Sequence, residues 1–199
     1  MAKELTNRMY LRIPLDRIGV VIGEKGEIKS EIEKKTNTII SIDGKTGEVT
    51  IENTPNTTDP SGILKARDII TAIARGFSPE KAFRLFDDNQ ILDVINLKEY
   101  IGDSKNHITR IKGRIIGEKG KTRKMIEELT DTYISIYGHT VSIIGGYEEV
   151  RVAREAIEML IRGMQHGTVY RFLDRKHSEL KRKALSLWEE RPELREDVK

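Results

Sequence analysis

The sequence of 199 residues contains no cysteine, and only 6% of its residues are aromatic. The absence of cysteine excludes disulfides, thiolate chemistry and cysteine-ligated zinc sites. The four histidines (His107, His139, His166 and His177) lack the short spacings of metal ligands. We therefore expect no metal site and no cofactor.

The sequence also lacks any long apolar stretch. The N-terminal segment MAKELTNRMY has no apolar run of the kind found in signal peptides. No segment approaches the ~20 apolar residues of a membrane-spanning helix. These absences predict a cytoplasmic protein that makes no contact with a membrane.

No arrangement typical of an enzyme stands out. The sequence offers no nucleophile with a neighbouring base, no pair of carboxylates and no cluster of metal ligands. Gly120-Lys121-Thr122 resembles the end of the phosphate-binding loop of nucleotide hydrolases, but Ile115 stands where that motif requires glycine. We therefore predict that the protein is not an enzyme.

What the sequence does contain is one four-residue motif, present twice. The motif GEKG occupies residues 23–26 and 117–120, and the sequences around it align without a gap over residues 19–42 and 113–136. Two copies of this length are typical of two small domains, because a repeat array needs several units to bury a core.

The hydrophobic pattern predicts the same order of elements in both copies: strand, helix, GEKG loop, helix, strand, strand, helix. In the first copy we expect elements at residues 9–14, 17–22, 27–35, 38–42, 48–52 and 63–75. In the second copy we expect them at residues 91–97, 104–116, 120–129, 133–137, 140–144 and 147–161. Ser78-Pro79 predicts the start of a short connecting helix that ends at Phe86.

Beyond residue 167 the repeat ends and one further helix is predicted. Its apolar residues recur at helical spacing: Val169, Phe172, Leu173, Leu180, Ala184, Leu187 and Trp188. This helix either packs on the body of the protein or binds a partner. The predicted α+β fold thus comprises a first domain (1–77), a connector (78–90), a second domain (91–166) and a C-terminal helix with a tail (167–199). We expect the two sheets to meet back to back.

The positive charge is concentrated in the second copy. The formal net charge of the whole chain is only +3, and residues 11–30 of the first copy are nearly balanced. Residues 105–124 contain one acidic residue, Glu118, among many basic ones: Lys105, Arg110, Lys112, Arg114, Lys119, Lys121, Arg123 and Lys124. A basic patch beside the second loop indicates an anionic partner.

Two helices joined by Gly-x-x-Gly form a surface suited to a phosphate backbone. Glycine lacks Cβ, so a phosphate can approach the main chain closely. The helix after the loop directs its first N–H groups and the positive end of its dipole toward an anion. Isoleucines of the neighbouring helices and strand would line an apolar groove in which bases are recognised at their edges.

The stretches VVIGEKG (residues 20–26) and RIIGEKG (residues 114–120), each followed by a threonine ten residues after the second glycine, resemble KH domains. The resemblance implies two tandem type I KH domains of order βααββα, whose GXXG loops clamp about four nucleotides. Both copies depart from the KH pattern three positions past the second glycine, where Lys29 and Arg123 replace an apolar residue. Thr122 also replaces the apolar Ile28 of the first copy.

Over its whole length the sequence is similar to the family of archaeal ribosome-assembly proteins with two KH domains, the counterparts of the eukaryotic Dim-two/Partner-of-Nob-one factor. The segment of residues 146–182 contributes to this resemblance. It implies binding to the single-stranded 3′ end of small-subunit (16S) ribosomal RNA during pre-rRNA processing. It also implies contact with the alpha subunit of translation initiation factor two and with a PIN-domain endonuclease.

We expect the second copy to be the main RNA-binding copy because its surroundings are basic. The predicted contacts are Gly23, Glu24, Lys25, Gly26, Lys29, Arg110, Lys112, Arg114, Ile115, Ile116, Gly117, Glu118, Lys119, Gly120, Lys121, Arg123, Lys124, Ile134 and Ile136. The loop would hold the backbone, the basic residues would face phosphates, and the isoleucines would line the groove or fill the core. The alternative is a protein-interaction scaffold, in which the first copy and the last helix bind proteins and RNA contact is minor.

Overall fold

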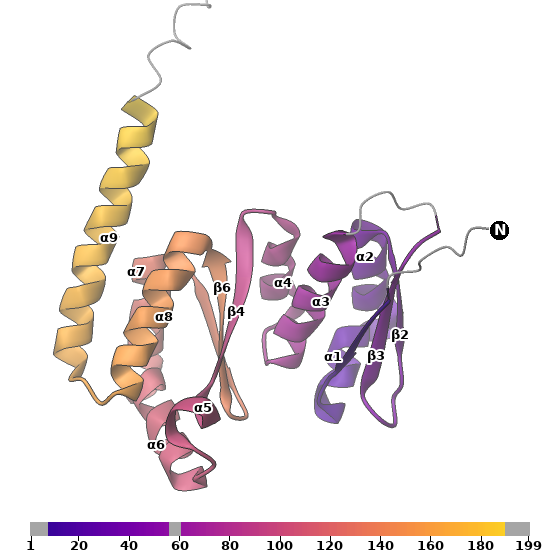
Figure 1. Cartoon of the computed structure of the whole chain (residues 1–199), viewed down its shortest axis with the longest axis horizontal. Coiled ribbons are helices and arrows are strands. Elements are labelled where there is room, and N and C mark those ends of the chain that lie inside the picture. The colour runs from indigo at the N-terminus through magenta and orange to yellow at the C-terminus, as the bar shows by residue number, and fades with distance from the viewer. Residues whose placement is uncertain (1–7, 56–60, 190–199) are drawn as a thin grey trace, which may run out of the picture. The chain divides into compact units, whose positions relative to one another are not determined.

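A computed structural model describes residues 8–55 and 61–189 of the chain (Figure 1). These residues form two compact units, which we describe separately. Unit 1 extends from the first described residue to Gly102 and also takes in Tyr133–Tyr147, whereas unit 2 consists of Asp103–Thr132 and the described residues from Glu148 onward. Among all these residues, no helix combines the length and the apolar character that crossing a membrane requires.

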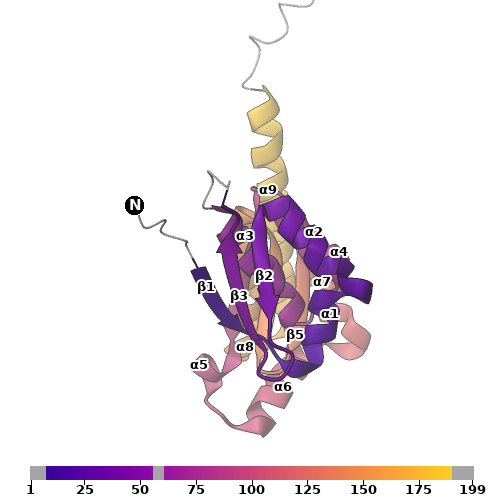
Figure 2. The ribbon, with the colours of Figure 1, turned by 90° about the vertical axis from the view of Figure 1, so that its right-hand side faces the viewer.

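The first copy folds within unit 1 in the predicted order. Its elements are β1 (Arg8–Arg12), the 3₁₀ helix η1 (Leu15–Arg17), α1 (Ile18–Ile22), the 3₁₀ helix η2 (Glu24–Gly26), α2 (Glu27–Thr36), β2 (Thr38–Ile42), β3 (Glu48–Asn53) and α3 (Ser61–Ala74). The three strands form an antiparallel sheet with β3 between β1 and β2 (Figure 2). The predicted elements are confirmed, and they differ from the observed ones only at their ends.

Alternation along these strands separates a buried face from an exposed one. Ile40 of β2 pairs with Ile51 of β3, which in turn pairs with Met9 of β1. Ile40 and Ile51 are buried, whereas Tyr10 and Ile39 on the opposite face are 70% and 49% exposed. Because successive strand residues point to opposite faces, one face of the sheet joins the hydrophobic core and the other faces solvent.

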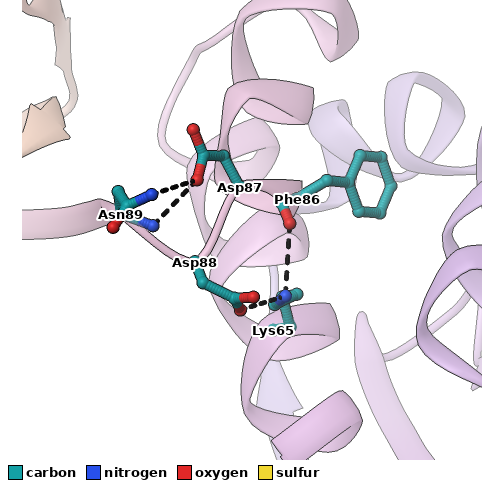
Figure 3. A network of polar contacts seen from close by, with 5 residues as sticks. All are labelled: Lys65, Phe86, Asp87, Asp88 and Asn89. Atoms are coloured by element: carbon teal, nitrogen blue, oxygen red, sulfur yellow. Dashed lines mark hydrogen bonds and ion pairs between the residues drawn. The ribbon is translucent and has the colours of Figure 1, made fainter. Parts of the chain in front are cut away.

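The connector, α4 (Pro79–Ala82) and the 3₁₀ helix η3 (Phe83–Phe86), is attached to α3. Lys65 of α3 donates to the carbonyl of Phe86 at 3.2 Å and forms an ion pair with Asp88 (Figure 3). The carboxylate of Asp87 accepts from the backbone N–H of Asn89 at 2.9 Å and from its side chain at 3.1 Å. These contacts hold the chain in place where it enters the second copy.

The strands of the second copy also belong to unit 1. They are β4 (Gln90–Asn96), β5 (Tyr133–Tyr137) and β6 (Thr140–Gly146), and they form an antiparallel sheet in the order β4-β6-β5. A short helix that was not predicted, α5 (Leu97–Ile101), follows β4. Asn96 caps this helix, because its side chain accepts a hydrogen bond from the N–H of Lys98 at 3.2 Å.

The expectation that the two sheets meet back to back is wrong. Ile144 of β6 belongs to the same hydrophobic core as α3 and the connector, with Leu92 and Tyr133 packed against it. The hydroxyl of Ser135 donates to the carbonyl of Arg75 at 2.9 Å. The second sheet therefore packs on the helical side of the first copy, and Figure 1 shows α3 and α4 between the strands of the two sheets. The outer face of the first sheet is unsuited to this contact, because burying its charged side chains would cost free energy.

Unit 2 contains α6 (Lys105–Ile116), the 3₁₀ helix η4 (Glu118–Gly120), α7 (Lys121–Thr130), α8 (Tyr147–Ile161, with its first residue in unit 1) and α9 (His166–Glu189). Along the chain the second copy thus has the predicted order of strands and helices, with α5 added. The predicted α+β fold with a C-terminal helix is confirmed. The domain boundaries at residues 77, 90 and 166 remain a prediction, because the two units group residues by packing.

The first half of α9 packs on helices of its own unit. Val169 and Leu173 are fully buried, and His177 Nδ1 lies 2.8 Å from the carbonyl oxygen of Leu129 at the end of α7. The interpretation that this helix packs on the body of the protein is confirmed for this half. The side chains of Ala184, Leu187 and Trp188 lie outside the described residues, so the partner-binding interpretation of the second half stays open.

Candidate nucleic-acid interface

The two GEKG loops adopt the same backbone conformation. The first glycine has φ 77° and ψ 176° at Gly23, and φ 72° and ψ 176° at Gly117. The third residue is left-handed in both loops, with φ 52° at Lys25 and 49° at Lys119. The duplication seen in the sequence is therefore also a duplication of main-chain geometry.

At the first glycine of each loop, a side chain would clash with neighbouring atoms, and the positive φ also favours glycine. A Cβ added to Gly117 would overlap the side chain and the backbone nitrogen of Thr122, and a Cβ added to Gly23 would overlap Ile28. Gly120, the last glycine of the second loop, has φ 79°, but a Cβ there would meet no atom within 4 Å. The first glycine thus lets the loop lie against the first turn of the next helix, whereas the last one is needed for its conformation alone.

Lys25 and Lys119 are held in a strained conformation. A left-handed φ costs a residue with a Cβ about 1–2 kcal/mol. Strain of this kind persists where the surrounding structure imposes a special geometry, and it is frequent at ligand-binding sites. Both lysines are exposed, so their strained backbone presents a charged side chain to solvent at the tip of each loop.

The helices that follow the loops begin without a side-chain cap. Their N-cap residues are Gly26 and Gly120, and neither helix receives a side-chain hydrogen bond at this position. The first N–H of each helix, at Glu27 or Lys121, donates to a carbonyl of the 3₁₀ turn before it. The next N–H groups have no partner within the helix, and they lie at the positive end of its dipole. A bound phosphate would accept hydrogen bonds from these groups and interact favourably with the dipole, so either loop is suited to hold one.

Exposed cations surround the second loop within unit 2. Arg110, Lys119, Lys121 and Lys124 are exposed and form no hydrogen bond or ion pair with another described residue. Lys112 is half-buried. Because the four exposed cations are not neutralised by carboxylates of the described chain, they are available to phosphates.

Arg114, which we predicted to face phosphate, is bonded to the end of α8. Its Nε donates to the carbonyl of Leu160 at 3.3 Å, and its Nη2 donates to the carbonyl of Met164 at 2.6 Å. These hydrogen bonds satisfy carbonyl groups that a helix leaves free at its C-terminus. Arg114 therefore has a structural role that the sequence did not reveal, and only its positive charge remains available to a ligand.

In the first copy an arginine also bonds two carbonyls at the end of the last helix, but it stands at a different position of the repeat. Arg17 donates from Nε to the carbonyl of Ile73 at 2.9 Å and from Nη2 to the carbonyl of Phe77 at 2.7 Å. These acceptors correspond to those of Arg114, but the two arginines do not align with each other. This mismatch explains why the comparison of the two copies did not single out Arg17.

Lys29 and Arg123, the two departures from the KH pattern, each pair with a glutamate one turn later. The ion pairs Lys29–Glu33 and Arg123–Glu127 both measure 3.6 Å. The Nε of Arg123 is buried and has no hydrogen-bond partner among the described residues. Because this Nε faces the carboxylate of Glu127 and is shielded from solvent, it is not available to a ligand.

The four predicted isoleucines are of two kinds. Ile115 and Ile134 are 0% and 3% exposed, so they belong to the core. Ile116 is 36% exposed and Ile136 is half-buried, so these two have surface to offer to bases. Burial thus decides between the two roles that the sequence left open.

The threonine downstream of each loop has a structural role. The hydroxyl of Thr36 donates to the carbonyl of Ile32 at 2.7 Å, and that of Thr130 donates to the carbonyl of Ile126 at 2.7 Å. Each threonine therefore caps the end of its own helix. Within residues 8–55 and 61–189, no group of three or more histidine, aspartate and glutamate side chains could hold a metal ion.

Family models match both copies of the repeat. Residues 91–178 match a model described as a eukaryotic type KH-domain (KH-domain type I). Residues 19–88 match a model of the Krr1 KH1 domain. Each match includes one GEKG loop.

Two proteins illustrate how widely the chain is related. A KH domain-containing protein of Methanocaldococcus jannaschii is 46% identical over 186 residues, which are 94% of this chain and 81% of that protein. The pre-rRNA-processing protein PNO1 of Coccidioides immitis is 34% identical over 127 residues, which are 63% of this chain and 50% of that protein. This chain therefore spans about half the length of that PNO1.

Solved structures extend the similarity to the fold. Dim2p from Pyrococcus horikoshii is 51% identical with a TM-score of 0.79, and the match covers 85% of this chain and 99% of that one. A chain of the a/eIF2alpha-aDim2p-rRNA complex from the same organism is 49% identical with a TM-score of 0.83, and the match covers 89% and 97% of the two chains. With two KH domains and this similarity along most of its length, the chain belongs to the family of archaeal two-KH-domain proteins related to Dim2p and PNO1.

Proposed function

We propose that this protein is a non-enzymatic RNA-binding factor, which binds the single-stranded 3′ end of small-subunit (16S) ribosomal RNA during pre-rRNA processing and small-subunit maturation. The second GEKG loop carries this proposal, because its uncapped helix start and the exposed cations around it lie together in unit 2. Relatives named for pre-rRNA processing and a relative solved together with rRNA support it. The cytoplasm is the proposed place of action.

Both loops have the geometry to hold a phosphate, but their surroundings differ. The second loop has Arg110, Lys121 and Lys124 nearby in the chain, all exposed and not paired with a carboxylate of the described residues. At the first loop, Glu27 and Ser30 stand at the positions of Lys121 and Lys124, so these two cations are missing there. We therefore assign the main RNA contact to the second loop.

The proposed protein partners are the alpha subunit of translation initiation factor two and a PIN-domain endonuclease. The first is supported by the relative that was solved in complex with a/eIF2alpha and rRNA. The second rests on the resemblance to the Dim-two/Partner-of-Nob-one factor alone. Both partners would be tested by copurification with the full-length chain.

An anisotropy titration tests the RNA proposal. The probe is a single-stranded RNA with the sequence of the 3′ end of 16S rRNA, and a shuffled RNA of equal length is the control. Wild type is compared with two matched variants, Glu24→Asp/Lys25→Asp and Glu118→Asp/Lys119→Asp. Aspartate tolerates the left-handed conformation, so both variants should fold while two carboxylates repel the RNA backbone at one loop.

We expect the variant in the second loop to bind the probe at least ten-fold more weakly, and the variant in the first loop to bind nearly as well as wild type. Equal binding of the probe and the shuffled RNA would refute the specificity for the 3′ end. Wild-type binding by both variants would refute the role of the loops in RNA binding.

A protein-interaction scaffold remains the second candidate function. It is favoured by Tyr10 and Ile39, two large apolar residues exposed on the outer face of the first sheet. A double variant, Tyr10→Ser/Ile39→Ser, should then lose the protein partner and keep RNA binding. Deleting residues 168–199 is a poorer test, because it removes Val169 and Leu173 from the core.

A further inference from the structure

A cleft of about 490 Å³ opens beside the second loop, on the side where α9 begins. All of its lining residues belong to unit 2: Arg110, Gly113, Arg114, Gly117, Glu118, Lys121, Thr122, His166 and Tyr170. The cleft thus shares Gly117 and Glu118 with the GEKG loop, but its far wall is a helix outside the βααββα repeat. None of the roles assigned above uses His166 or Tyr170.

The floor of the cleft is one face of α6. Arg110, Gly113, Arg114 and Gly117 are spaced three, one and three residues apart, so they share one side of the helix. Gly113 lies inside the helix, where alanine would be more favourable, and a Cβ at this position would meet no atom within 4 Å. Packing within the chain therefore does not require glycine at this position. A ligand that lies close to the helix backbone would require it, because any side chain here would keep the ligand away.

The charge of the cleft is positive. Arg110 and Lys121 are exposed and unpaired within the described residues. Arg114 bonds only neutral carbonyl groups, so its charge is not cancelled. Glu118 is the one carboxylate in the lining, against these three cations. Such a cleft favours an anionic ligand.

The far wall adds an aromatic ring in a fixed position. The hydroxyl of Tyr170 lies 2.9 Å from that of Thr122, in the first turn of α7. The ring of His166 lies 6.1 Å from that of Tyr170, and its Nε2 donates to the carbonyl of Arg114 at 3.0 Å. Two hydrogen bonds thus orient this pair of rings, and Tyr170 remains only half-buried. A half-exposed aromatic ring beside cations is the combination that binds single-stranded nucleic acid, because the ring stacks on a base and the cations bind its phosphate.

We propose that this cleft is an additional nucleotide subsite, which holds the RNA nucleotide adjoining those bound at the second GEKG loop. Arg110 and Lys121 bind its phosphate, and the ring of Tyr170 stacks on its base. The inference rests on the proposed RNA-binding function, and it adds that α9, outside the repeated KH unit, lengthens the stretch of RNA that the second copy binds.

The test compares RNAs of different length on the full-length protein. A single-stranded RNA of four nucleotides, taken from the 3′ region of 16S rRNA, is compared with versions lengthened by two nucleotides at the 5′ end or at the 3′ end. We expect one of the two extensions to raise the affinity about ten-fold, as one stacked and phosphate-bound nucleotide does. The variant Tyr170→Ala should lose most of this gain and keep most of its affinity for the short RNA, and this retained affinity also shows that it is folded. Arg110→Ala/Lys121→Ala should also lose the gain, but it should bind the short RNA more weakly as well, because both cations lie beside the loop.

Two further variants separate the cleft from general effects. Arg171→Ala/Arg175→Ala removes two exposed arginines of α9 that do not line the cleft, so this variant should keep the gain. Tyr170→Phe loses the hydroxyl but keeps the ring, so it should retain more of the gain than Tyr170→Ala. The inference is overturned if neither extension raises the affinity, or if the α9 control variant loses as much as the cleft variants. If wild type binds none of these RNAs, the proposed function itself fails.

Discussion

At the scale of single residues, the glycines of the second loop are needed for different reasons. A Cβ at Gly117 would overlap Thr122, and the positive φ of this residue would also be strained in any residue other than glycine. A Cβ at Gly120 would overlap nothing, so only the positive φ would be strained there. We expect Gly120→Ala to lower the free energy of unfolding by about 1–2 kcal/mol, and Gly117→Ala to lower it further. Urea denaturation of the two variants measures the difference. Equal losses would show that Thr122 moves aside without cost.

Tyr137 provides a pH-dependent contact inside unit 1. Its hydroxyl donates to the carboxylate of Asp16, and this hydrogen bond, with a smaller effect of burial, raises the pKa of Tyr137 above its ordinary value of 10.0. The contact needs the protonated phenol, so it stabilises the fold fully below about pH 10 and is lost as the pH rises through the higher pKa of the folded state.

We therefore expect the wild type to lose stability above about pH 10 by more than the variant Tyr137→Phe, which lacks this hydrogen bond at every pH. Denaturation with urea at several pH values between about 8 and 11 measures the difference. Parallel losses in both proteins would mean that the contact does not contribute in solution.

At the scale of elements, an arginine secures the C-terminal end of the last helix in each copy. Arg17 bonds two carbonyls at the end of α3, and Arg114 bonds the corresponding two at the end of α8. Only the planar guanidinium presents two donors in this geometry, so lysine cannot replace it. This contact holds the helix before each GEKG loop against the end of the copy.

We expect Arg114→Lys to lower the free energy of unfolding by about 1–2 kcal/mol, although the charge is kept. Arg17→Lys should behave alike in the first copy, which makes it the matched comparison. Thermal denaturation of both variants tests this. A variant with lysine that is as stable as wild type would show that the two hydrogen bonds are replaceable.

At the scale of the whole molecule, the proposed RNA contact is dominated by phosphates. Each phosphate neutralised on a single strand contributes about −0.7 to the slope of log K against log salt. With about four to six contacts, we expect a slope of about −3 to −4 for the wild type. Anisotropy titrations from low to moderate salt measure it. An affinity that does not change with salt would exclude the basic surface of unit 2 as the binding site.

Much of the fold and part of the site could be predicted from the sequence, because these features depend on neighbouring residues. The glycines of GEKG determine two sharp loops, β-branched residues favour the strands at Thr38–Ile42 and Tyr133–Tyr137, and apolar spacing defines the helices between them. The helix α5 was missed because it depends on a cap that Asn96 provides directly after a strand. The site prediction was incomplete for Arg114, since a basic residue in a basic segment looks the same whether it faces phosphate or a helix end.

The sequence by itself determined that this chain contains two copies of one repeat, where the loops of the two copies lie, and which copy is basic. Each of these properties follows from local composition and spacing. Only the tertiary structure decided which distant segments meet. It placed the second sheet on the helical side of the first copy, directed Arg114 to the end of α8, and set Tyr170 against Thr122 beside the loop. Contacts of this kind depend on how buried faces match, and no local pattern along the chain encodes that match.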